Sequence, residues 1–339
     1  MILAADVGGT NARLAVYTAD GEKLVRRETY ASHNYKSFED VARAFLAAGG
    51  ETPLAACIGV AGPVVDGRCV ATNLPWVLDE RVIAEALAIP KVSLINDLVA
   101  LSMGALHARP EDLTLLHGSA LPRTEGANLA VIAAGTGLGE SILVWDGQRH
   151  VVCGTEGGHV DFAPRNEIEI ELLRYLVSRV KGRVSYERIL SGPGIGNVYD
   201  FFREAKAIPE DEAAEASLAA APDRNALITK LGTSGESTAA ARAIRLFISL
   251  YGAEAGNLVL KSLAVGGVYV MGKVAATLSS QLVQKGFVES FLDKGRLRQV
   301  LEKVPIALVS DSAIGLSGSA RYAAAALAHS RLADARSLP

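Results

Sequence analysis

The sequence is poor in cysteine and lacks any apolar run long enough to cross a bilayer. Its three cysteines, Cys57, Cys69 and Cys153, have neither CxxC nor another metal-binding spacing, and an odd number argues against a disulfide framework. A reducing cytoplasm is therefore the expected compartment. None of the apolar runs reaches the roughly 18 residues that a membrane span needs, and no basic segment precedes an apolar one at the N-terminus. We expect a soluble, cytoplasmic protein without a membrane partner.

A large excess of either charge is also missing. The chain of 339 residues carries 34 basic and 37 acidic side chains, which gives a formal net charge of −3. Nucleic acid and anionic membrane surfaces are therefore not expected as partners. The length exceeds that of one typical domain and suits two domains, each with a large buried core.

The N-terminal stretch, residues 1–17, contains the first functional motif. An apolar run ends at Asp6, two glycines and a threonine follow, and a second apolar run leads to an Asp-Gly pair. This pattern predicts a strand, a tight turn and a second strand. Adjacent glycines bring backbone N–H groups close to an anion such as a phosphate, and a carboxylate beside them can hold hydrated Mg²⁺. An ordinary Gly-Gly hairpin is the alternative.

The same pattern occurs a second time at residues 129–147. Gly9 and Thr10 align with Gly135 and Thr136, and the Asp-Gly pair at 20–21 aligns with the pair at 146–147 at the same offset. The two segments therefore look like one unit used twice. A duplicated unit with two phosphate-binding turns predicts two halves that face each other across a cleft, each contributing a turn to one nucleotide.

Asn96 and Asp97 stand where a short apolar strand ends and an apolar helix begins. In an open α/β sheet, ligands collect beyond the carboxyl ends of the strands. An amide and a carboxylate there can hold a polyol, and the carboxylate can take a hydroxyl proton. Both residue types are also favoured as helix N-caps, which is the alternative interpretation, and the two roles can coexist.

Other polar residues stand beside glycines or prolines. Glu156 and His159 flank two adjacent glycines, so one short loop can turn both side chains toward a small ligand. The pair could also be half of a metal site, but no second His or Cys with ligand spacing lies nearby. Glu187 precedes a Gly-Pro-Gly loop, where an exposed helical glutamate is the alternative. Asn73 precedes a Pro-Trp pair, where a packed loop is the alternative.

Two glycine motifs resemble known nucleotide sites but fail in detail. Residues 135–139 have GxGxG spacing, and a hairpin rather than a helix is predicted to follow, so a Rossmann site is not favoured. Residues 267–273 fit GxxxxGK, yet Val274 replaces the Ser or Thr that would bind Mg²⁺, and the intervening residues are typical of a strand. This second motif is interpreted as a chance match.

The rest of the chain alternates apolar strands with amphipathic helices. Beside the two hairpins, strands are expected at about 23–29, 54–61, 91–95, 265–271 and 304–310, and helices at about 37–48, 98–106, 167–180 and 238–263. Residues 205–237 are expected to form helices around loops. An Ala-rich helix closes the chain, and its small residues at 315 and 318–320 predict close packing, as at a hinge.

Together these motifs resemble the bacterial ATP-dependent glucokinases of the non-ROK branch, within the hexokinase/actin-like superfamily. The resemblance runs in order over essentially the whole chain, and the Cys-rich zinc motif of ROK-type sugar kinases is absent from the sequence. The segments that carry it are 6–13, 95–97, 135–139, 156–164 and 187–194.

The resemblance implies a two-domain actin-like ATPase (ribonuclease H-like) fold, a duplicated α/β fold with a central cleft. The small domain is expected to comprise residues 1–108 and 312–339, and the large domain residues 109–311. The implied reaction is ATP-dependent phosphorylation of D-glucose to glucose 6-phosphate in glycolysis, with ATP and Mg²⁺, by a possible homodimer. A kinase for another hexose or an N-acetylated sugar, a catalytically silent sugar sensor, and donors such as ADP or polyphosphate are the alternatives.

The resemblance also implies a role for each motif residue. Asp97 is the expected general base for the sugar hydroxyl. The other sugar contacts are expected from Asn73, Asn96, Glu156, His159 and Glu187. The nucleotide is expected on Asp6, Val7, Gly8, Gly9, Thr10 and Asn11, on Gly135, Thr136 and Gly137, and on Gly272 and Lys273. Mg²⁺ is expected near Asp6, held through water.

One turn departs from the family pattern. After the strand at 265–271 we expect two adjacent glycines and, three residues on, a proline, whereas the chain has Gly272, Lys273 and Ala276 at these positions. The lysine adds bulk and charge where a glycine would let the backbone approach the purine or ribose. It either weakens adenine packing or reaches the nucleotide phosphates and compensates.

Overall fold

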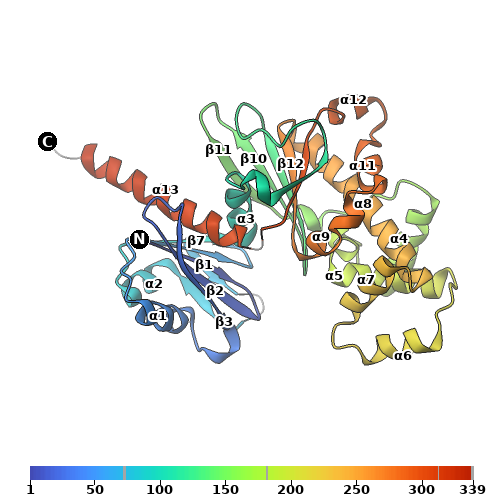
Figure 1. Ribbon diagram of the computed structural model, residues 1–339, viewed down its shortest axis with the longest axis horizontal. Coiled ribbons are helices and arrows are strands. Elements are labelled where there is room, and N and C mark those ends of the chain that lie inside the picture. Colours follow the sequence, from blue (N-terminus) through green and yellow to red (C-terminus); the bar gives the residue numbers. More distant parts are fainter. Residues whose placement is uncertain (72–73, 181, 312, 337–339) are drawn as a thin grey trace. The chain divides into compact units, whose positions relative to one another are not determined.

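The structure is a computed structural model that describes residues 1–71, 74–180, 182–311 and 313–336 (Figure 1). It divides into two compact units, Met1–Arg109 with Asp311–Pro339, and Pro110–Ser310. Asn73, one of the expected sugar-binding residues, lies outside the described residues.

The first unit is built on a five-stranded sheet with the strand order β3-β2-β1-β4-β7. The strands are β1 Ile2–Val7, β2 Asn11–Tyr17, β3 Leu24–Ala31, β4 Ala55–Val60 and β7 Lys91–Asn96. β1 is antiparallel to β2 and parallel to β4, which is in turn parallel to β7. The predicted strand, turn and strand at residues 1–17 are therefore confirmed.

Helices cover both faces of this sheet because side chains alternate along each strand. Leu3 and Ala5 of β1 pack in one apolar cluster with residues of α1 and α2, whereas Ile2 and Ala4 pack in another with residues of α3 and α13. The helices are α1 Phe38–Gly49, α2 Glu80–Leu87, α3 Asp97–Ala105 and α13 Ile314–Arg336, with the short turn η1 Ser32–Asn34 and the hairpin strands β5 Arg68–Val70 and β6 Val77–Asp79.

The closing helix α13 packs against α3 with almost no space between the two backbones. A Cβ built on Gly318 would lie 1.8 Å from the Ala100 carbonyl oxygen, and one on Gly104 would lie 2.2 Å from the Ile314 carbonyl oxygen. Only glycine fits at either position, because a Cβ never lies so close to a backbone atom. The close packing predicted from the small residues of α13 is confirmed.

The second unit is built on a six-stranded sheet with the order β11-β10-β9-β12-β13-β8. The strands are β8 Leu113–His117, β9 Leu129–Ala134, β10 Leu138–Trp145, β11 His150–Thr155, β12 Gly267–Met271 and β13 Ile306–Val309. β9 is antiparallel to β10 and parallel to β12, which is parallel to β13. Apart from the added edge strand β8, this is the strand order and pairing of the first unit, so the predicted duplication is confirmed.

The helices of the second unit pack around one long core helix, α8 Thr238–Ser262 (Figure 1). By length and composition, α8 is the one helix among the described residues that could cross a membrane, yet 72% of its apolar window is buried within the structure, as in a core helix. The other helices are α4 Glu167–Arg179, α5 Gly192–Asp200, α6 Glu212–Ala220, α7 Arg224–Ser234, α9 Lys273–Thr277, α10 Ser279–Leu282, α11 Lys285–Leu292 and α12 Arg298–Leu301, with the short turns η2 Pro110–Asp112, η3 Gly157–His159, η4 Tyr186–Arg188, η5 Phe201–Ala205 and η6 Gly295–Leu297.

The structure also tests the interpretation of the two glycine motifs that resemble known nucleotide sites. Residues 135–137 are followed by the strand β10, not by the helix of a Rossmann site. Residues 267–271 are the buried strand β12, so the GxxxxGK match has no phosphate-binding loop. Both rejections are confirmed.

Candidate active site

The first Gly/Thr turn joins β1 to β2 in the first unit. The Gly8 N–H donates to the Asn11 carbonyl at 3.0 Å, and the Ser32 hydroxyl donates to the Gly8 carbonyl at 3.0 Å. These bonds close the turn and tie it to the end of β3. Gly9, Thr10 and Asn11 remain exposed, so their backbone groups are accessible to a ligand.

Asp6 stands beside this turn and has a partner that the sequence interpretation missed. Its Oδ2 accepts a hydrogen bond from Arg13 Nη1 at 2.8 Å, and both side chains are partly exposed. Arg13 lies directly opposite Asp6 in the β1/β2 register. Counting outward from the turn along both predicted strands would have paired them.

Asn96 and Asp97 lie at the carboxyl end of β7, where α3 begins. The Leu98 N–H donates to both Asn96 Oδ1 and Asp97 Oδ1, each at 2.9 Å. The Asn96 amide also donates to the carbonyl of Gly62, just beyond β4, at 3.2 Å. The capping interpretation is therefore confirmed for Asn96, whose position is fixed by two bonds.

The second Gly/Thr turn, Gly135–Gly137, is held from two sides within the second unit. The Gly192 N–H, at the start of α5, donates to the Gly135 carbonyl at 2.8 Å. Glu187 Oε2 accepts from the Leu138 N–H at 3.0 Å. A Cβ on Gly137 would lie 2.4 Å from that same Oε2, so the carboxylate rests against the turn.

A pocket of about 280 Å³ opens beside this turn. Gly135, Thr136 and Lys273, three of the expected nucleotide-binding residues, line it. The other lining residues were not predicted; they are Gly192, Pro193, Ile195, Asp223, Asn225, Ala226, Thr229, Val274 and Thr277. The segment before α7 was interpreted as packing, although its Asp223 has the residue type of a helix N-cap and accepts from the Ala226 N–H at 3.0 Å.

The structure brings Glu156, His159 and Glu187 together in the second unit. His159 Nε2 lies 3.9 Å from Glu156 Oε2, and His159 Nδ1 lies 3.9 Å from Glu187 Oε1. All three side chains retain exposed surface, Glu156 the most at 78%. Among the described residues no group of three or more His, Cys, Asp or Glu could hold a metal ion. The structure therefore adds no further metal ligand to the pair Glu156 and His159.

The loop that carries Glu156 and His159 owes its position to its two glycines. A Cβ on Gly158 would lie 1.9 Å from the Leu138 carbonyl oxygen. The loop therefore lies directly on the first residues of β10, and no side chain fits between them. This contact explains why Gly157 and Gly158 separate the two functional side chains.

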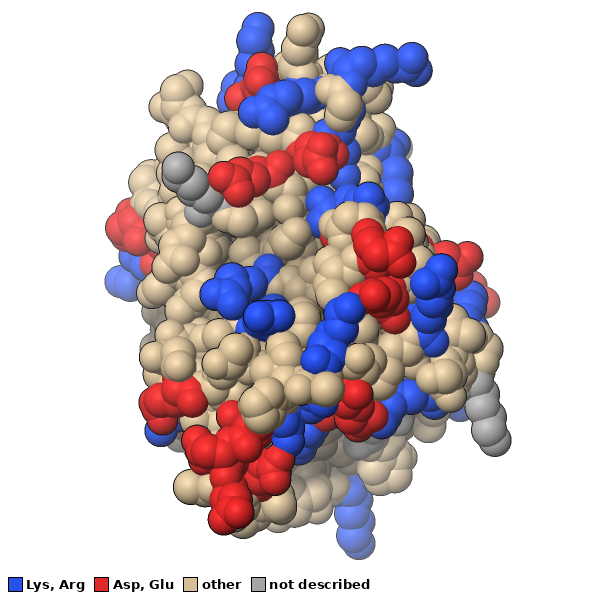
Figure 2. All heavy atoms as spheres, turned by 90° about the vertical axis from the view of Figure 1, so that its right-hand side faces the viewer, with Lys and Arg blue, Asp and Glu red and all other residues tan. Residues whose placement is uncertain are grey.

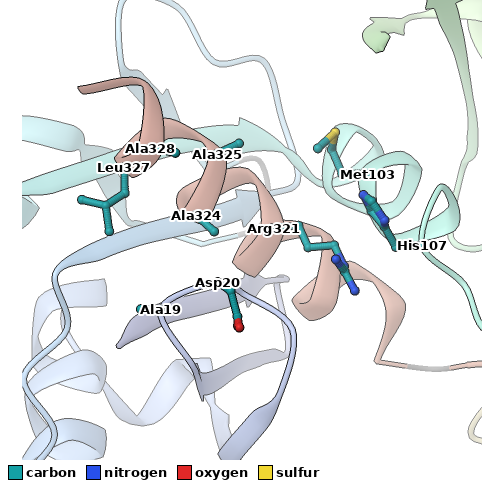
Figure 3. A pocket seen from close by; sticks show the side chains of 9 residues that line it. All are labelled: Ala19, Asp20, Met103, His107, Arg321, Ala324, Ala325, Leu327 and Ala328. Carbon is teal, nitrogen blue, oxygen red and sulfur yellow. The ribbon is translucent and has the colours of Figure 1, made fainter. Parts of the chain in front are cut away.

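A separate groove of about 380 Å³ lies in the first unit, at the end of α3 remote from Asp97 (Figure 3). It is lined by Asp20 from the β2/β3 turn, Met103 and His107 from α3 and the residues after it, and the α13 face that carries Arg321. Burial and the neighbouring Arg321 charge lower the pKa of His107. None of the expected site residues lines this groove.

Charges of both signs are interspersed on the face in Figure 2. This distribution agrees with the nearly balanced numbers of basic and acidic residues in the sequence.

Two sheets of one strand order, each with a Gly/Thr turn between its first two strands, define the duplicated α/β fold of the actin-like ATPases. A family model described as "Glucokinase" matches residues 3–326. The chain belongs to the glucokinase family.

Individual relatives agree with this assignment. A glucokinase of Nostoc sp. is 37% identical over 341 residues, covering 96% of this chain and 99% of the relative. A glucokinase of Yersinia pestis is 35% identical over 320 residues, covering 94% and 95%. The crystal structure of a glucokinase from an Antarctic psychrotroph has a TM-score of 0.81 and 30% identity and covers 97% of this chain and 98% of that one. A ROK-family glucokinase from Streptomyces griseus, at 20% identity, a TM-score of 0.63 and coverages of 95% and 98%, shares the fold.

Proposed function

We propose that this chain transfers the γ-phosphoryl group of ATP to D-glucose and so forms glucose 6-phosphate. The observation that carries the proposal is the convergence of Glu156, His159 and Glu187 beside the Gly135–Gly137 turn. A cluster suited to sugar hydroxyls and a turn suited to phosphate thus adjoin within one unit. Family membership supports the same reaction, and the glucokinase of Balamuthia mandrillaris has been solved in complex with glucose.

The polar cluster suits a sugar because carboxylates accept hydrogen bonds from hydroxyls and an imidazole can donate or accept. Glu156, His159 and Glu187 hold the glucose hydroxyls in this proposal, and Asn96 holds a further one. Asn96 is suited to that role because its amide is already fixed by Leu98 and Gly62. The proposed role of Asn73 rests on the sequence alone.

The nucleotide is assigned to the two Gly/Thr turns and to the pocket beside the second one. The backbone groups of Gly8–Asn11 and Gly135–Gly137, which are exposed or half-buried, suit the phosphates. The pocket of about 280 Å³ suits the adenosine, because Lys273, which follows Gly272 at the start of α9, lines its wall. Val7 borders the first turn as the last residue of β1.

Mg²⁺ fits the residues beside the first turn. Such an ion commonly keeps several waters and uses one or two carboxylates together with the substrate phosphates. Asp6 offers a partly exposed carboxylate there, already bound on one oxygen by Arg13. We therefore assign Asp6 to the hydrated ion, which would neutralise charge on the transferring phosphoryl group when bound.

For phosphoryl transfer, the protein mainly has to position the reactants, stabilise the charge of the transition state and supply one proton acceptor. The 6-hydroxyl oxygen attacks the γ-phosphorus, the bond to the bridging oxygen of ADP breaks, and the hydroxyl proton passes to the Asp97 carboxylate. Asp97 suits this role because it begins α3 at the carboxyl end of β7, beside the fixed Asn96. In this proposal the units Met1–Arg109 with Asp311–Pro339 and Pro110–Ser310 are the small and large domains of a cytoplasmic glycolytic enzyme that can form a homodimer.

A coupled assay of ADP formation tests the proposal. The purified protein is given ATP and Mg²⁺ with glucose, galactose, mannose, fructose and N-acetylglucosamine in parallel, and ADP and polyphosphate replace ATP with glucose. We expect glucose to have the highest kcat/KM with ATP as donor. Higher activity toward another sugar would favour the other-hexose alternative, and binding of glucose without turnover would favour a sugar sensor.

A further inference from the structure

A group of ionisable side chains lies buried behind the loop that carries Glu156 and His159. Glu140, on β10, is 1% exposed, and Glu254, on α8, is 0% exposed. Glu254 is fully paired, because Oε1 accepts from Lys261 Nζ and Oε2 accepts from Asn257 Nδ2, each at 2.8 Å. Glu140 differs, since its Oε1 is buried and has no hydrogen-bond partner among the described residues.

The Glu140 carboxyl lies in direct contact with the loop Glu156–His159. A Cβ on Gly157 would lie 2.2 Å from Glu140 Oε2, so the Gly157 backbone rests on the carboxyl. The Thr155 hydroxyl donates to the Glu140 carbonyl at 2.7 Å and accepts from the Gly157 N–H at 3.1 Å. The loop is therefore hydrogen-bonded to the backbone at Glu140 through Thr155 and lies against the Glu140 carboxyl.

Burial makes a charge on this carboxyl unfavourable. Burial first, and then the nearby Glu254 charge, raise the pKa of Glu140 to about 8, with Lys261 acting in the opposite direction. An unpaired buried carboxylate has lost its water without gaining a partner, so the neutral acid is the favoured form near pH 7.

Two phenols and a lysine also pack around the cluster. Burial raises the pKa of Tyr251 and Tyr186, so both phenols stay neutral. Burial lowers the pKa of Lys294, whose Nζ donates to Asn257 Oδ1 at 2.6 Å. On the loop side, the Glu156 and His159 side chains are more than half exposed.

We propose that Glu140 is a positioning residue for the sugar site: its protonated carboxyl supports the loop Glu156–His159, and loss of that proton to solvent displaces the loop and weakens glucose binding. The inference rests on the proposed function, in which Glu156 and His159 hold glucose. Gly157 covers Oε2 of this carboxyl, so hydration of a carboxylate from the loop side requires the loop to lift. Glucose affinity therefore falls at alkaline pH while the chemistry at Asp97 is retained.

The test is the pH dependence of the glucose KM between pH 6.5 and 9.5 in the wild type and in Glu140→Gln. Glutamine keeps the shape and neutrality of the protonated acid. We expect the wild-type KM to rise about tenfold for each pH unit above the pKa of the group, as for loss of one proton, and the Glu140→Gln KM to stay nearly constant. The KM for ATP and kcat should change much less in both proteins.

Two further variants control the result. Glu254→Gln removes the charge that raises the pKa of Glu140, so the rise in KM should begin at lower pH. Glu169→Gln changes another fully buried glutamate, which pairs with Arg165 at the start of α4, and should keep the wild-type profile. A rise in the glucose KM of Glu140→Gln equal to that of the wild type would overturn the proposal.

An infrared titration separates failure of this inference from failure of the proposed function. The carbonyl stretch of a buried protonated carboxyl should disappear from the wild type as pH rises and be absent from Glu140→Gln throughout. If the wild type does not phosphorylate glucose at any pH, the proposed function fails and the infrared result alone decides the protonation state. A Glu140 that is already ionised at pH 7 would overturn the inference even in an active enzyme.

Discussion

The Glu187 carboxylate accepts a hydrogen bond from the Leu138 N–H at 3.0 Å. This bond joins the polar cluster, which Glu187 forms with Glu156 and His159, to the second Gly/Thr turn. The other oxygen of the same carboxylate lies 3.9 Å from His159 Nδ1. One side chain therefore contacts both the backbone that follows the turn and a residue of the cluster. Its position depends on Gly137, because any Cβ there would meet the carboxylate.

Gly137→Ala should raise the KM for glucose without unfolding the protein. The new Cβ would lie 2.4 Å from Glu187 Oε2, and the flexible carboxylate can move away from it. Loss of a hydrogen bond to a charged group should raise the KM by roughly tenfold or more. Steady-state kinetics with varied glucose, together with a thermal melt that stays near the wild type, would check this.

Gly135→Ala is the matched control for that variant. A Cβ at Gly135 meets nothing within 4 Å, and Gly135 lines the pocket assigned to the nucleotide. The KM for ATP should therefore rise while the KM for glucose stays close to the wild type. Equal effects of the two alanines on the KM for glucose would contradict the contact between residue 137 and Glu187 as the cause of the change.

Asp97→Asn should lower kcat by roughly 10²–10⁴ while leaving glucose binding nearly intact, because a positioned general base contributes that range. The fold should survive, since Asn96 Oδ1 also accepts from Leu98 N–H at 2.9 Å and continues to cap α3. Turnover is measured by the coupled assay, and glucose binding by calorimetry. A variant that keeps the wild-type kcat would remove Asp97 from the proposed mechanism.

The sequence predicted the fold well because the informative patterns are local. Strand periodicity and the Gly/Thr turns at 8–10 and 135–137 determine each antiparallel pair, and the repeat of the pattern indicates the duplication. The same reasoning predicted α1 from its Ser37 cap, which accepts from the Asp40 N–H at 3.3 Å. These features depend on neighbours in the chain, so they can be read without tertiary contacts.

The missed residues depend on contacts between distant segments. Glu140 looks like an ordinary polar residue in a strand, and only the tertiary fold buries it and brings Glu254 of α8 close to it. Asp223 lines the pocket because α7 packs near the start of α5, which no local pattern specifies. The bond between Glu187 and Leu138 likewise spans segments that are far apart in sequence.

Sugar selectivity follows from the polar cluster. If Glu156, His159 and Glu187 each bond a hydroxyl of glucose, a sugar with an inverted or missing hydroxyl leaves one of these groups unpaired. Glucose should therefore have a clearly higher kcat/KM than its epimer galactose. Equal kcat/KM values for the two sugars would mean that the cluster does not bind the hydroxyl that is inverted in galactose.

Glu140→Gln should also change stability in a pH-dependent way. Because the pKa of Glu140 is raised in the folded protein, its stabilising contribution is present below the unfolded pKa of about 4.5 and is lost as pH rises toward about 8. The variant should therefore melt higher than the wild type at pH 8.5, by on the order of a few degrees. Differential scanning calorimetry at pH 6 and 8.5 checks the sign, and a difference that does not change with pH would contradict it.

The turn at Lys273 has a geometry that explains part of its departure from the family pattern. Gly272 has a φ of 95°, and a Cβ on it would lie 2.2 Å from the Ala134 carbonyl oxygen, so this first glycine is required. Ala276 donates its N–H to the Gly272 carbonyl at 3.0 Å, a bond that the expected proline could not make. Lys273, as the first residue of α9, lines the pocket together with Thr136 and Asp223.

We predict that Lys273 acts through charge on the nucleotide phosphates, and that the enzyme accepts several nucleoside triphosphates with modest discrimination. Lys273→Gly should then raise the KM for ATP by at most about fivefold, most visibly at low salt, because an exposed charge contact is weak and screened. Lys273→Met, which keeps the length but not the charge, should have the same effect, whereas Lys230→Met on the exposed surface of α7 should have none. Kinetics with ATP, GTP and ITP at two salt concentrations measure this. If Lys273→Gly instead tightens ATP binding and sharpens the preference for adenine, the lysine only obstructs the purine, and its assigned role is wrong.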